Sequence, residues 1–219
     1  MKHFVLCSAL LFALSPCASA QSVGFGVQGD VINFTVGNMT NTLSVNTGGD
    51  FTGDLKSIYG LGWGGGIHFD LNLVILSLRV SGDYITLSPD KDKYTTLLAK
   101  YIGQAASAVT IDGGRVNIYS ANANLKLKVL PLPIVSVYAT GGVGLARVAV
   151  SEATVKFNNI PVTTYPAIQS QTKPSANVGA GVDITLGGLT LYGELKFEFI
   201  FTDPKTSNEL PCATVGITF

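Results

Sequence analysis

The chain has 219 residues, of which 47% are apolar and 13% are charged, and its formal net charge is zero. This balance provides neither the basic surface that nucleic-acid binding requires nor a polybasic anchor for anionic lipid, so a nucleic-acid partner is excluded. The length has room for one domain or two small ones. The apolar content is high for so few charges, and it predicts that much apolar surface must be kept from water.

The N-terminal segment has the features of a cleaved export signal. A short basic start precedes an apolar run from Phe4 to Leu14, and the small residues that end at Ala20 form a cleavage pattern. Because the run is too short to span a bilayer, we predict a signal peptide over residues 1–20 and a mature chain that begins at Gln21. Lipid modification of Cys17 is the alternative, to which the preceding proline is a poor fit.

The mature chain has neither a disulfide scaffold nor a transmembrane helix. Removal of the signal takes Cys7 and Cys17 with it, so Cys212 is left without a partner for an internal disulfide. We interpret Cys212 as a small side chain at the start of the last strand, and a reactive thiol is the alternative. After the signal, no apolar run approaches the roughly 18 residues of a membrane-spanning helix.

Apolar residues recur at every second position, which is typical of β-strands because successive side chains point to opposite faces. From Tyr59 to Asn72, aromatic and aliphatic residues hold the odd positions, whereas glycines, His68 and Asp70 hold the even ones. The alternation slips near Gly29, where we expect a bulge. The pattern predicts eight strands, at residues 22–36, 59–72, 74–84, 119–129, 135–145, 175–184, 191–201 and 213–219.

The connections between these strands alternate strictly in length. Tight turns are predicted at residues 70–73, 130–133 and 186–189. Long polar loops are predicted at residues 37–57, 88–114, 151–173 and 203–210. This alternation places the tight turns and both termini at one end of the sheet and the long loops at the other.

Period two alone does not identify the outer face, since a soluble lipocalin-like barrel and a membrane barrel alternate equally. The glycines from Gly60 to Gly66 favour the membrane barrel, because they share the polar face and the interior of an eight-stranded barrel is narrow. Strands of about ten residues also cross the roughly 25 Å apolar band of an outer membrane. We therefore predict that Trp63 and Phe197 meet lipid. Interfacial aromatic girdles would include Tyr59, Phe69, Tyr84, Phe199, Phe201 and Phe219.

Three stretches carry a family resemblance: PIVSVYATGGVGLA at 133–146, NVGAGVDITLGGLTLYGELKFEF at 177–199, and the terminal ATVGITF. They resemble the small outer-membrane β-barrels of diderm bacteria, of the type of the outer-membrane protein A transmembrane domain and the opacity-type surface antigens. The resemblance implies an all-β, eight-stranded, antiparallel, up-and-down barrel over residues 21–219, monomeric and embedded in outer-membrane lipid. It also implies that the barrel-insertion machinery reads Val215, Ile217 and Phe219.

The predicted inward face carries charged residues in near balance of sign. Charges in a narrow lumen need partners, because desolvation of an unpaired charge costs several kcal/mol. We interpret them as a polar plug, and a gate or ion path is the alternative. The predicted network comprises Arg79, Asp83, Lys126, Lys128, Asp183, Glu194, Lys196 and Glu198, with Asp70 beside it.

His68 is the only histidine of the predicted mature chain, so a metal site or His-based catalysis would depend on it. Lipid A deacylases and palmitoyl transferases are eight-stranded barrels that combine a histidine with a serine and an acidic residue. Here Asp70 shares the face of His68, but Ser77 or Ser81 would have to supply the nucleophile from the next strand. The His-x-Ser arrangement of the deacylases is missing. We predict no catalysis, no cofactor and no metal.

The long loops are the expected seat of function, because a rigid barrel presents them to the outside. In the loop at 88–114, Ser88 and Pro89 have the features of a helix start, and the apolar spacing that follows is helical. This helix would rest on lipid headgroups, bind a partner or pack over the barrel mouth. We predict a structural or surface-interaction role, in envelope integrity or in adhesion to a host or surface ligand. The alternatives are a narrow channel for ions or small solutes and, third, a lipid-modifying enzyme.

Overall fold

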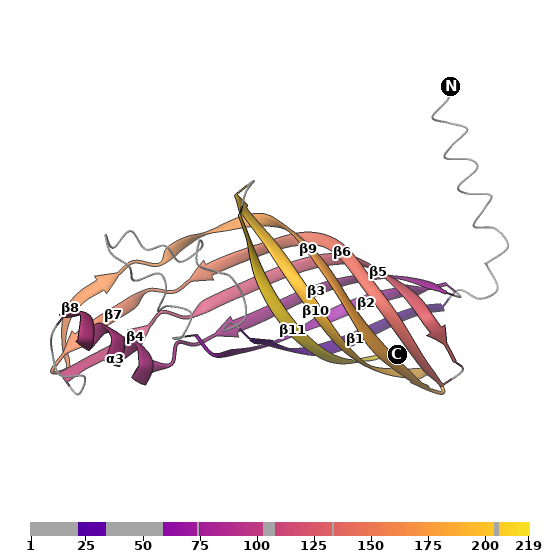
Figure 1. Cartoon of the computed structure of the whole chain (residues 1–219), viewed down its shortest axis with the longest axis horizontal. Coiled ribbons are helices and arrows are strands. Elements are labelled where there is room, and N and C mark those ends of the chain that lie inside the picture. The colour runs from indigo at the N-terminus through magenta and orange to yellow at the C-terminus, as the bar shows by residue number, and fades with distance from the viewer. Residues whose placement is uncertain (1–21, 34–58, 74, 103–107, 133, 204–205) are drawn as a thin grey trace, which may run out of the picture.

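The structure is a computed structural model that describes residues 22–33, 59–73, 75–102, 108–132, 134–203 and 206–219. Eight strands close into an antiparallel barrel in the order β1-β11-β10-β9-β6-β5-β3-β2, as predicted. A second sheet, β4-β7-β8, and the helix α3 extend beyond one end of the barrel (Figure 1). The elements are β1 (Ser22–Asn33), β2 (Leu61–Asn72), β3 (Leu76–Leu87), α3 (Lys91–Ile102), β4 (Val109–Gly113), β5 (Val116–Pro131), β6 (Val135–Val150), β7 (Ala153–Phe157), β8 (Ile160–Tyr165), β9 (Ile168–Leu186), β10 (Leu189–Asp203) and β11 (Thr206–Thr218).

The short turns share one end of the barrel with the start of β1 and the C-terminus, as the sequence predicts. Ser22 lies opposite Asn72, and the backbone N–H of Phe25 donates to the carbonyl of Phe219 over 3.2 Å. A two-glycine turn joins β9 to β10 at this end, and Gly187 takes φ 66°, which glycine adopts without strain. Short turns are periplasmic in outer-membrane barrels and longer connections extracellular. The opposite end of the barrel is therefore the extracellular one.

β1 keeps a continuous register with both of its neighbours. It pairs with β11 from Gly26 to Ile32 and with β2 along its whole length, without a shift. The bulge predicted near Gly29 is therefore wrong. The sequence looked interrupted there because Gly29 holds an outward position where no side chain marks the face. Residues 34–36, which the sequence assigns to this strand, lie outside the described residues.

The outer face of the barrel wall is apolar, and Trp63 and Phe197 both point away from the lumen, as predicted. Closure pairs β1 with β11, so the sheet has no open edge along the wall. Hydrocarbon offers no water to an unpaired backbone group, which makes closure obligatory there. The placement of Tyr59 in the outer girdle is wrong. Tyr59 precedes β2, is buried, and donates its hydroxyl hydrogen to the carbonyl of Gly114 over 2.7 Å.

Two prolines lie where the pairing between neighbouring barrel strands ends on the extracellular side. The pairing of β9 with β10 ends at Ser175 and Ile200, and Pro174 is the next residue of β9 toward the extracellular side. Among the described residues, β11 pairs with β1 from Cys212 onward, and Pro211 lies just outside that pairing. Because proline has no N–H to donate, each one ends a ladder. Above them β10 and β11 continue to pair with each other as far as Asp203 and Thr206. The long loop predicted at 203–210 is therefore wrong, since only residues 204–205 separate these strands.

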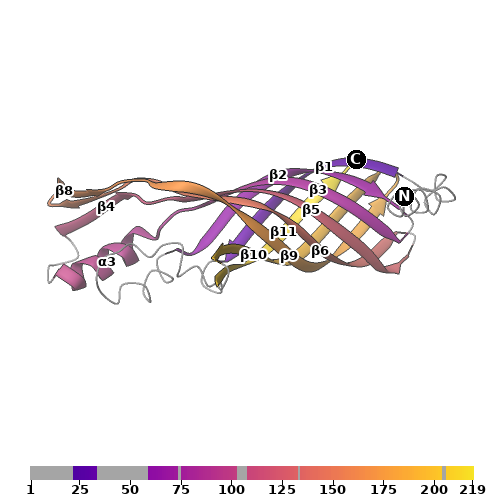
Figure 2. The ribbon, with the colours of Figure 1, turned by 90° about the horizontal axis from the view of Figure 1, so that it is seen from above.

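We call the sheet β4-β7-β8 together with α3 the arm, and it extends the long axis of the barrel (Figures 1 and 2). The prediction of long loops at 88–114 and 151–173 is wrong in part, because β4 lies within the first range and β7 and β8 lie within the second. The predicted helix is confirmed, but Asp90 rather than Ser88 caps it, since Asp90 Oδ1 accepts the N–H of Lys93 over 3.2 Å. No helix among the described residues is long and apolar enough to cross a membrane.

The arm has an apolar core of its own, formed by Ala99 of α3 with Val109, Ile111 and Val155 of the sheet. Phe157 packs against the edge of this core. The helix therefore packs on the arm sheet and not over the barrel mouth, which corrects that alternative. The arm is an α+β layer, with apolar side chains of β4 and β7 packed together with α3.

Candidate functional site

The lumen holds most of the charged residues that the sequence assigned to it. Buried positions belong to Arg79, Asp83, Lys126, Asp183, Glu194, Lys196 and Glu198. Lys128 is only half-buried and lies where the β5–β6 register shifts. Asp30 is also buried in the lumen and was not predicted, because the supposed bulge at Gly29 obscured which face it occupies. With Asp30 included, acidic residues outnumber basic ones inside the described part of the barrel.

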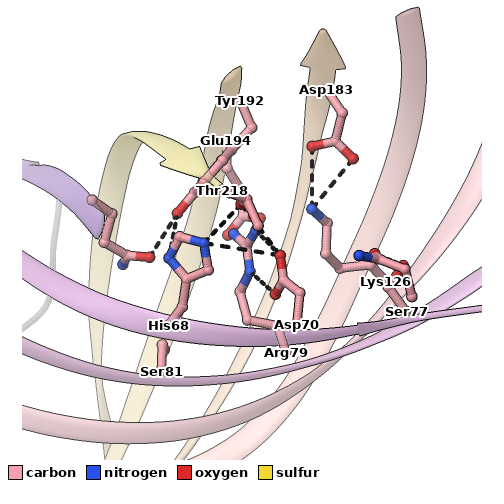
Figure 3. Close-up of polar contacts among 12 residues, drawn as sticks. His68, Asp70, Ser77, Arg79, Ser81, Lys126, Asp183, Tyr192, Glu194 and Thr218 are labelled. Carbon is pink, nitrogen blue, oxygen red and sulfur yellow. Dashed lines mark hydrogen bonds and ion pairs between the residues drawn. The ribbon is translucent and has the colours of Figure 1, made fainter. Parts of the chain in front are cut away.

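A bidentate ion pair joins β2 to β3 in the lumen (Figure 3). Asp70 lies directly opposite Arg79, whose Nε and Nη2 donate to the two carboxylate oxygens over 2.7 Å each. The guanidinium carbon also lies 4.1 Å from the centre of the Tyr192 ring. A buried charge is tolerated only when its partner satisfies it, and this geometry does so for both residues.

His68 stands beside this pair and makes two hydrogen bonds (Figure 3). Its Nε2 lies 2.9 Å from Thr218 Oγ1, and its Nδ1 lies 3.3 Å from the Tyr192 hydroxyl. Tyr192 gives its single hydroxyl hydrogen to Gln28 Oε1 over 2.7 Å. Nδ1 therefore donates to Tyr192, and Nε2 accepts from Thr218. Both ring nitrogens are thus engaged in the packing of the lumen.

Several side-chain hydrogen bonds cross the seam where β1 meets β11, and we call three of them the seam clasp. Thr214 donates to Asp30 Oδ1 over 2.6 Å, directly between the two strands. His68 on β2 reaches Thr218 on β11 across Gly26, where a Cβ would lie 2.3 Å from His68 Nε2. Tyr192 on β10 likewise reaches Gln28 on β1 across Gly216, where a Cβ would lie 2.6 Å from its hydroxyl. Inward glycines therefore make room for side chains that bridge the seam.

A second ion pair joins β5 to β9 (Figure 3). Lys126 Nζ donates to both oxygens of Asp183, over 3.2 Å and 3.4 Å. The same ammonium lies 3.8 Å from the centre of the Tyr138 ring, and Tyr138 donates its hydroxyl hydrogen to Glu194 Oε2 over 2.9 Å. Charges on three strands are thus linked by one lysine and one tyrosine.

A third group surrounds Asp83 toward the extracellular side. Gln28 Nε2 donates to Asp83 Oδ1 over 2.6 Å, and Ser81 donates to Asp83 Oδ2 over 3.2 Å. Asp30 Oδ2 and Glu198 Oε1 have no hydrogen-bond partner among the described residues. No ion pair of Lys196 is found in that part of the chain either. The structure therefore brings the network together as linked clusters and leaves this group less completely paired.

An apolar layer closes the lumen above the charged groups, and the sequence did not predict it. Its members lie at the extracellular ends of the strands and are buried: Ile32, Tyr59, Ile85, Leu87, Val116, Ile118, Ala146, Ile200, Leu210 and Cys212. They occupy inward positions. The expectation of an interior that is polar throughout is therefore wrong. Cys212 belongs to this layer, within β11 and not at its start.

The residues weighed as catalytic do not form a catalytic arrangement. Ser81 lies opposite His68 in the β2–β3 register, but its hydroxyl donates to Asp83. Ser77 donates to Asn72 Oδ1 over 2.8 Å. Neither serine makes a hydrogen bond to His68 among the described residues. In that part of the chain, no group of His, Cys, Asp and Glu side chains is arranged to hold a metal ion.

The comparison with protein families decides which class of barrel this is. The model of the outer membrane protein beta-barrel domain family matches residues 4–207. The chain belongs to this family. It is accordingly an integral barrel protein of the outer membrane, with its apolar wall in lipid. Among curated protein sequences, none matches the chain.

Solved structures of other outer-membrane barrels share the fold at low identity. Neisserial surface protein A is 13% identical, with a TM-score of 0.54 over 90% of this chain and 97% of that one. A major outer membrane protein of Thermus thermophilus is 14% identical, with a TM-score of 0.51 over 90% of this chain and 100% of that one. Ail of Yersinia pestis is 13% identical, with a TM-score of 0.43 over 90% of this chain and 95% of that one. The first two likenesses support the fold alone, and the role of the arm is argued from its own residues.

Proposed function

We propose that this outer-membrane barrel is a non-catalytic surface-interaction protein whose arm binds a partner outside the cell. The observation that carries the proposal is the composition and exposure of β8. All six of its residues are exposed, and Ile160 and Val162 are 68% and 66% exposed. The apolar side chains of β4 and β7 are covered by α3, whereas those of β8 are left in water. Exposed apolar side chains clustered on one strand are typical of an interaction surface.

The arm is also built to hold this strand in place. Asn158 and Asn159 take φ 48° and 64°, which gives a tight turn between β7 and β8. Lys156 of β7 donates to Asp112 of β4 over 2.6 Å, which links these two strands through their side chains. A preformed strand loses little conformational entropy when it binds, which favours recognition.

The test is adhesion of bacteria that display the full-length protein. We expect Ile160→Asn combined with Val162→Asn to lower adhesion to host cells or an abiotic surface by about tenfold, the equivalent of about 1.4 kcal/mol. Thr164→Asn changes a polar residue of the same strand and is the matched control. Unchanged adhesion of the double variant, displayed at wild-type level, would exclude β8 as the binding surface.

We further propose that the barrel does not conduct ions. Support comes from the apolar layer, in which Ile32, Ile200 and Leu210 are fully buried above the charged groups. An ion would have to lose its hydration shell there without gaining a ligand. Refolded protein in a planar bilayer is expected to give no single-channel steps. Reproducible steps from the wild-type protein would favour the channel alternative instead.

Lipid modification by His68 has less support, because both of its ring nitrogens are bound within the lumen. We expect the lipid A profile of cells to be the same with the wild-type protein, with His68→Ala and with the gene deleted. A lipid A species that depends on the protein and on His68 would overturn the non-catalytic assignment.

The steps of export and assembly are part of the same proposal. Residues 1–20 would be removed as a signal peptide, and mass spectrometry of the membrane form is expected to find Gln21 at its start. Val215 is exposed on the outer face of β11, Ile217 is half-buried there, and Phe219, which follows the strand, is exposed. This exposure suits recognition by the insertion machinery. Deletion of Phe219 is expected to lower the amount of folded protein in the membrane, with unfolded precursor accumulating.

A further inference from the structure

The outward face of the barrel wall carries a single positive charge within the described strands. Arg147 of β6 shares its face with Val143 and Leu145, both of which are exposed. Among the outward residues of the described barrel strands, no other lysine or arginine occurs. A cation on the lipid face is destabilising near the middle of the bilayer and tolerated near the interface. Its height on the wall therefore decides what it contacts.

The height of Arg147 corresponds to the extracellular interface. At about 3.3 Å per residue and a strand tilt of about 40°, the wall rises about 30 Å from Val135 to Arg147, slightly more than the roughly 25 Å apolar band. Outward residues below it on β6 are apolar or glycine, whereas the outward residues Asn117 of β5 and Thr86 of β3 are polar. Arg147 therefore lies where the hydrocarbon of the outer leaflet meets its headgroups.

Two tyrosines lie beside Arg147 on the next two strands of the wall, β5 and β3. Tyr119 is directly opposite Arg147 across β5 and β6, and Tyr84 is directly opposite Tyr119 across β3 and β5. Their rings are 5.0 Å apart at 41° and both are exposed. The hydroxyls of Tyr84 and Thr86 each donate to Asn117 Oδ1 over 3.0 Å, which directs the tyrosine hydroxyl toward the polar side. The three residues form a continuous row on the wall.

The guanidinium of Arg147 is oriented but not neutralised. Its Nε donates to Ser170 Oγ of β9 over 2.6 Å, which fixes the plane of the group. Among the described residues it forms no ion pair, so both Nη groups are available to an anion. A planar guanidinium with two free amino groups matches the geometry of a phosphate. Aromatic rings at this depth pack against the sugar or upper acyl carbons of a headgroup.

We propose that Arg147, Tyr119 and Tyr84 bind the phosphate-bearing headgroup of an outer-leaflet glycolipid of the lipid A type. Arg147 pairs with the phosphate, and the tyrosines pack against the sugar to which the phosphate is attached. This row lies at the extracellular interface and therefore contacts the outer leaflet. The phosphate is accordingly assigned to a glycolipid and not to a phospholipid. The inference rests on the orientation of the barrel and not on the binding role of β8.

The test compares the thermal resistance of the full chain refolded in vesicles of defined composition. Phosphatidylcholine vesicles with diphosphorylated lipid A are expected to raise the unfolding midpoint by about 4 °C over phosphatidylcholine alone. Arg147→Ala is expected to lose most of this gain, and Arg147→Lys to keep part of it, because lysine retains the charge without the bidentate geometry. Arg115→Ala, which removes an exposed arginine just before β5, is the matched control and should keep the gain.

Two further vesicle compositions identify the source of the phosphate. Lipid A without phosphates should give little gain, and phosphatidylglycerol at equal charge should give less than half of it. Should Arg147→Ala fail to refold, Arg147→Gln replaces it in the same comparison. An equal gain in the arginine variants and the wild type would overturn the site. A full gain from phosphatidylglycerol, or from lipid A without phosphates, would overturn the glycolipid assignment.

Discussion

The barrel and the arm pack their apolar side chains in opposite directions. On the barrel, Leu195 and Trp63 point outward, whereas Lys196 lies inside. In the arm, Ile111 is buried between sheet and helix, whereas the neighbouring Asp112 faces water. Both regions are antiparallel sheets of one chain, and the strands of the arm lie within the connections between barrel strands. The difference teaches that alternation defines two faces, while the surrounding solvent decides which of them is outside.

The contrast is sharpest at two aliphatic side chains with nearly equal exposure. Leu195, near the middle of β10, is 70% exposed, and Ile160 of β8 is 68% exposed. Leu195→Arg should destabilise the protein by about 2–4 kcal/mol, because the charge would stand in hydrocarbon. Ile160→Arg should change stability by no more than about 0.5 kcal/mol, because it would stand in water. Urea unfolding in lipid vesicles measures both, and equal effects would contradict the assignment of the two solvents.

The inner and outer faces of β1 offer a second matched pair. A Cβ at Gly26 would lie 2.1 Å from the carbonyl oxygen of Ile217 and 2.3 Å from His68 Nε2, whereas one at Gly29 would meet nothing within 4 Å. Gly26→Ala should therefore open the seam clasp and cost about 1–3 kcal/mol. Gly29→Ala should be close to neutral. Gel mobility of unheated samples in SDS reports barrel closure, and a Gly26→Ala barrel as resistant as wild type would argue against the clasp.

The barrel wall was largely predictable from the sequence, whereas single positions such as Asp30 and Tyr59 were not. The alternation around Trp63 and Phe197 predicted the barrel and its strand count, because a period of two persists wherever one face meets lipid. Which face is outside was predicted from strand length and from the glycines between Gly60 and Gly66, which share the polar face. Asp30 was missed, since the outward Gly29 beside it has no side chain to mark the alternation. Tyr59 was misplaced because the alternation continues past the point where β2 begins.

The arm and the apolar layer were beyond this kind of prediction for physical reasons. β4, β7 and β8 are short strands in polar stretches. The buried apolar residues of β4 and β7 are explained only by their shared core with α3, which is remote in sequence from β7. Ile118 and Ile200 belong to an inward face that looked polar as a whole. Their burial results from packing against side chains of other strands in the same cluster, and the pattern of a single strand does not reveal such packing.

The turn of the arm gives a smaller effect that leaves the barrel unchanged. Asn158 and Asn159 both have positive φ, which β-branched residues tolerate poorly. Asn159→Val should destabilise the β7–β8 hairpin by about 1–2 kcal/mol, and Asn159→Gly should not. Limited proteolysis of intact cells should cut the valine variant faster near residues 158–159 while the barrel keeps its SDS resistance. Loss of barrel resistance would show that the two regions do not fold independently.

The smallest expected effect concerns pH in the arm. The hydrogen bond and charge of Lys156, with Lys91 further away, lower the pKa of the Asp112 carboxyl below its usual value. The folded pKa is the lower one, so the stabilisation is complete above the unfolded value near about 4 and is lost as pH falls through the folded pKa. Hydrogen exchange of β4 and β7 should rise slightly below about pH 4 in the wild type. Asp112→Asn should remove this pH dependence without affecting the barrel.

The central claim, that hydrocarbon surrounds the barrel wall, is tested most directly by the fluorescence of Trp63. It is the only tryptophan of the chain and is 62% exposed on the outer face near the extracellular end of β2. In vesicles we predict strong quenching by lipids brominated near the top of the acyl chain, weaker quenching by lipids brominated at the chain end, and little quenching by aqueous iodide. Efficient quenching by iodide without quenching by brominated lipids would contradict the account.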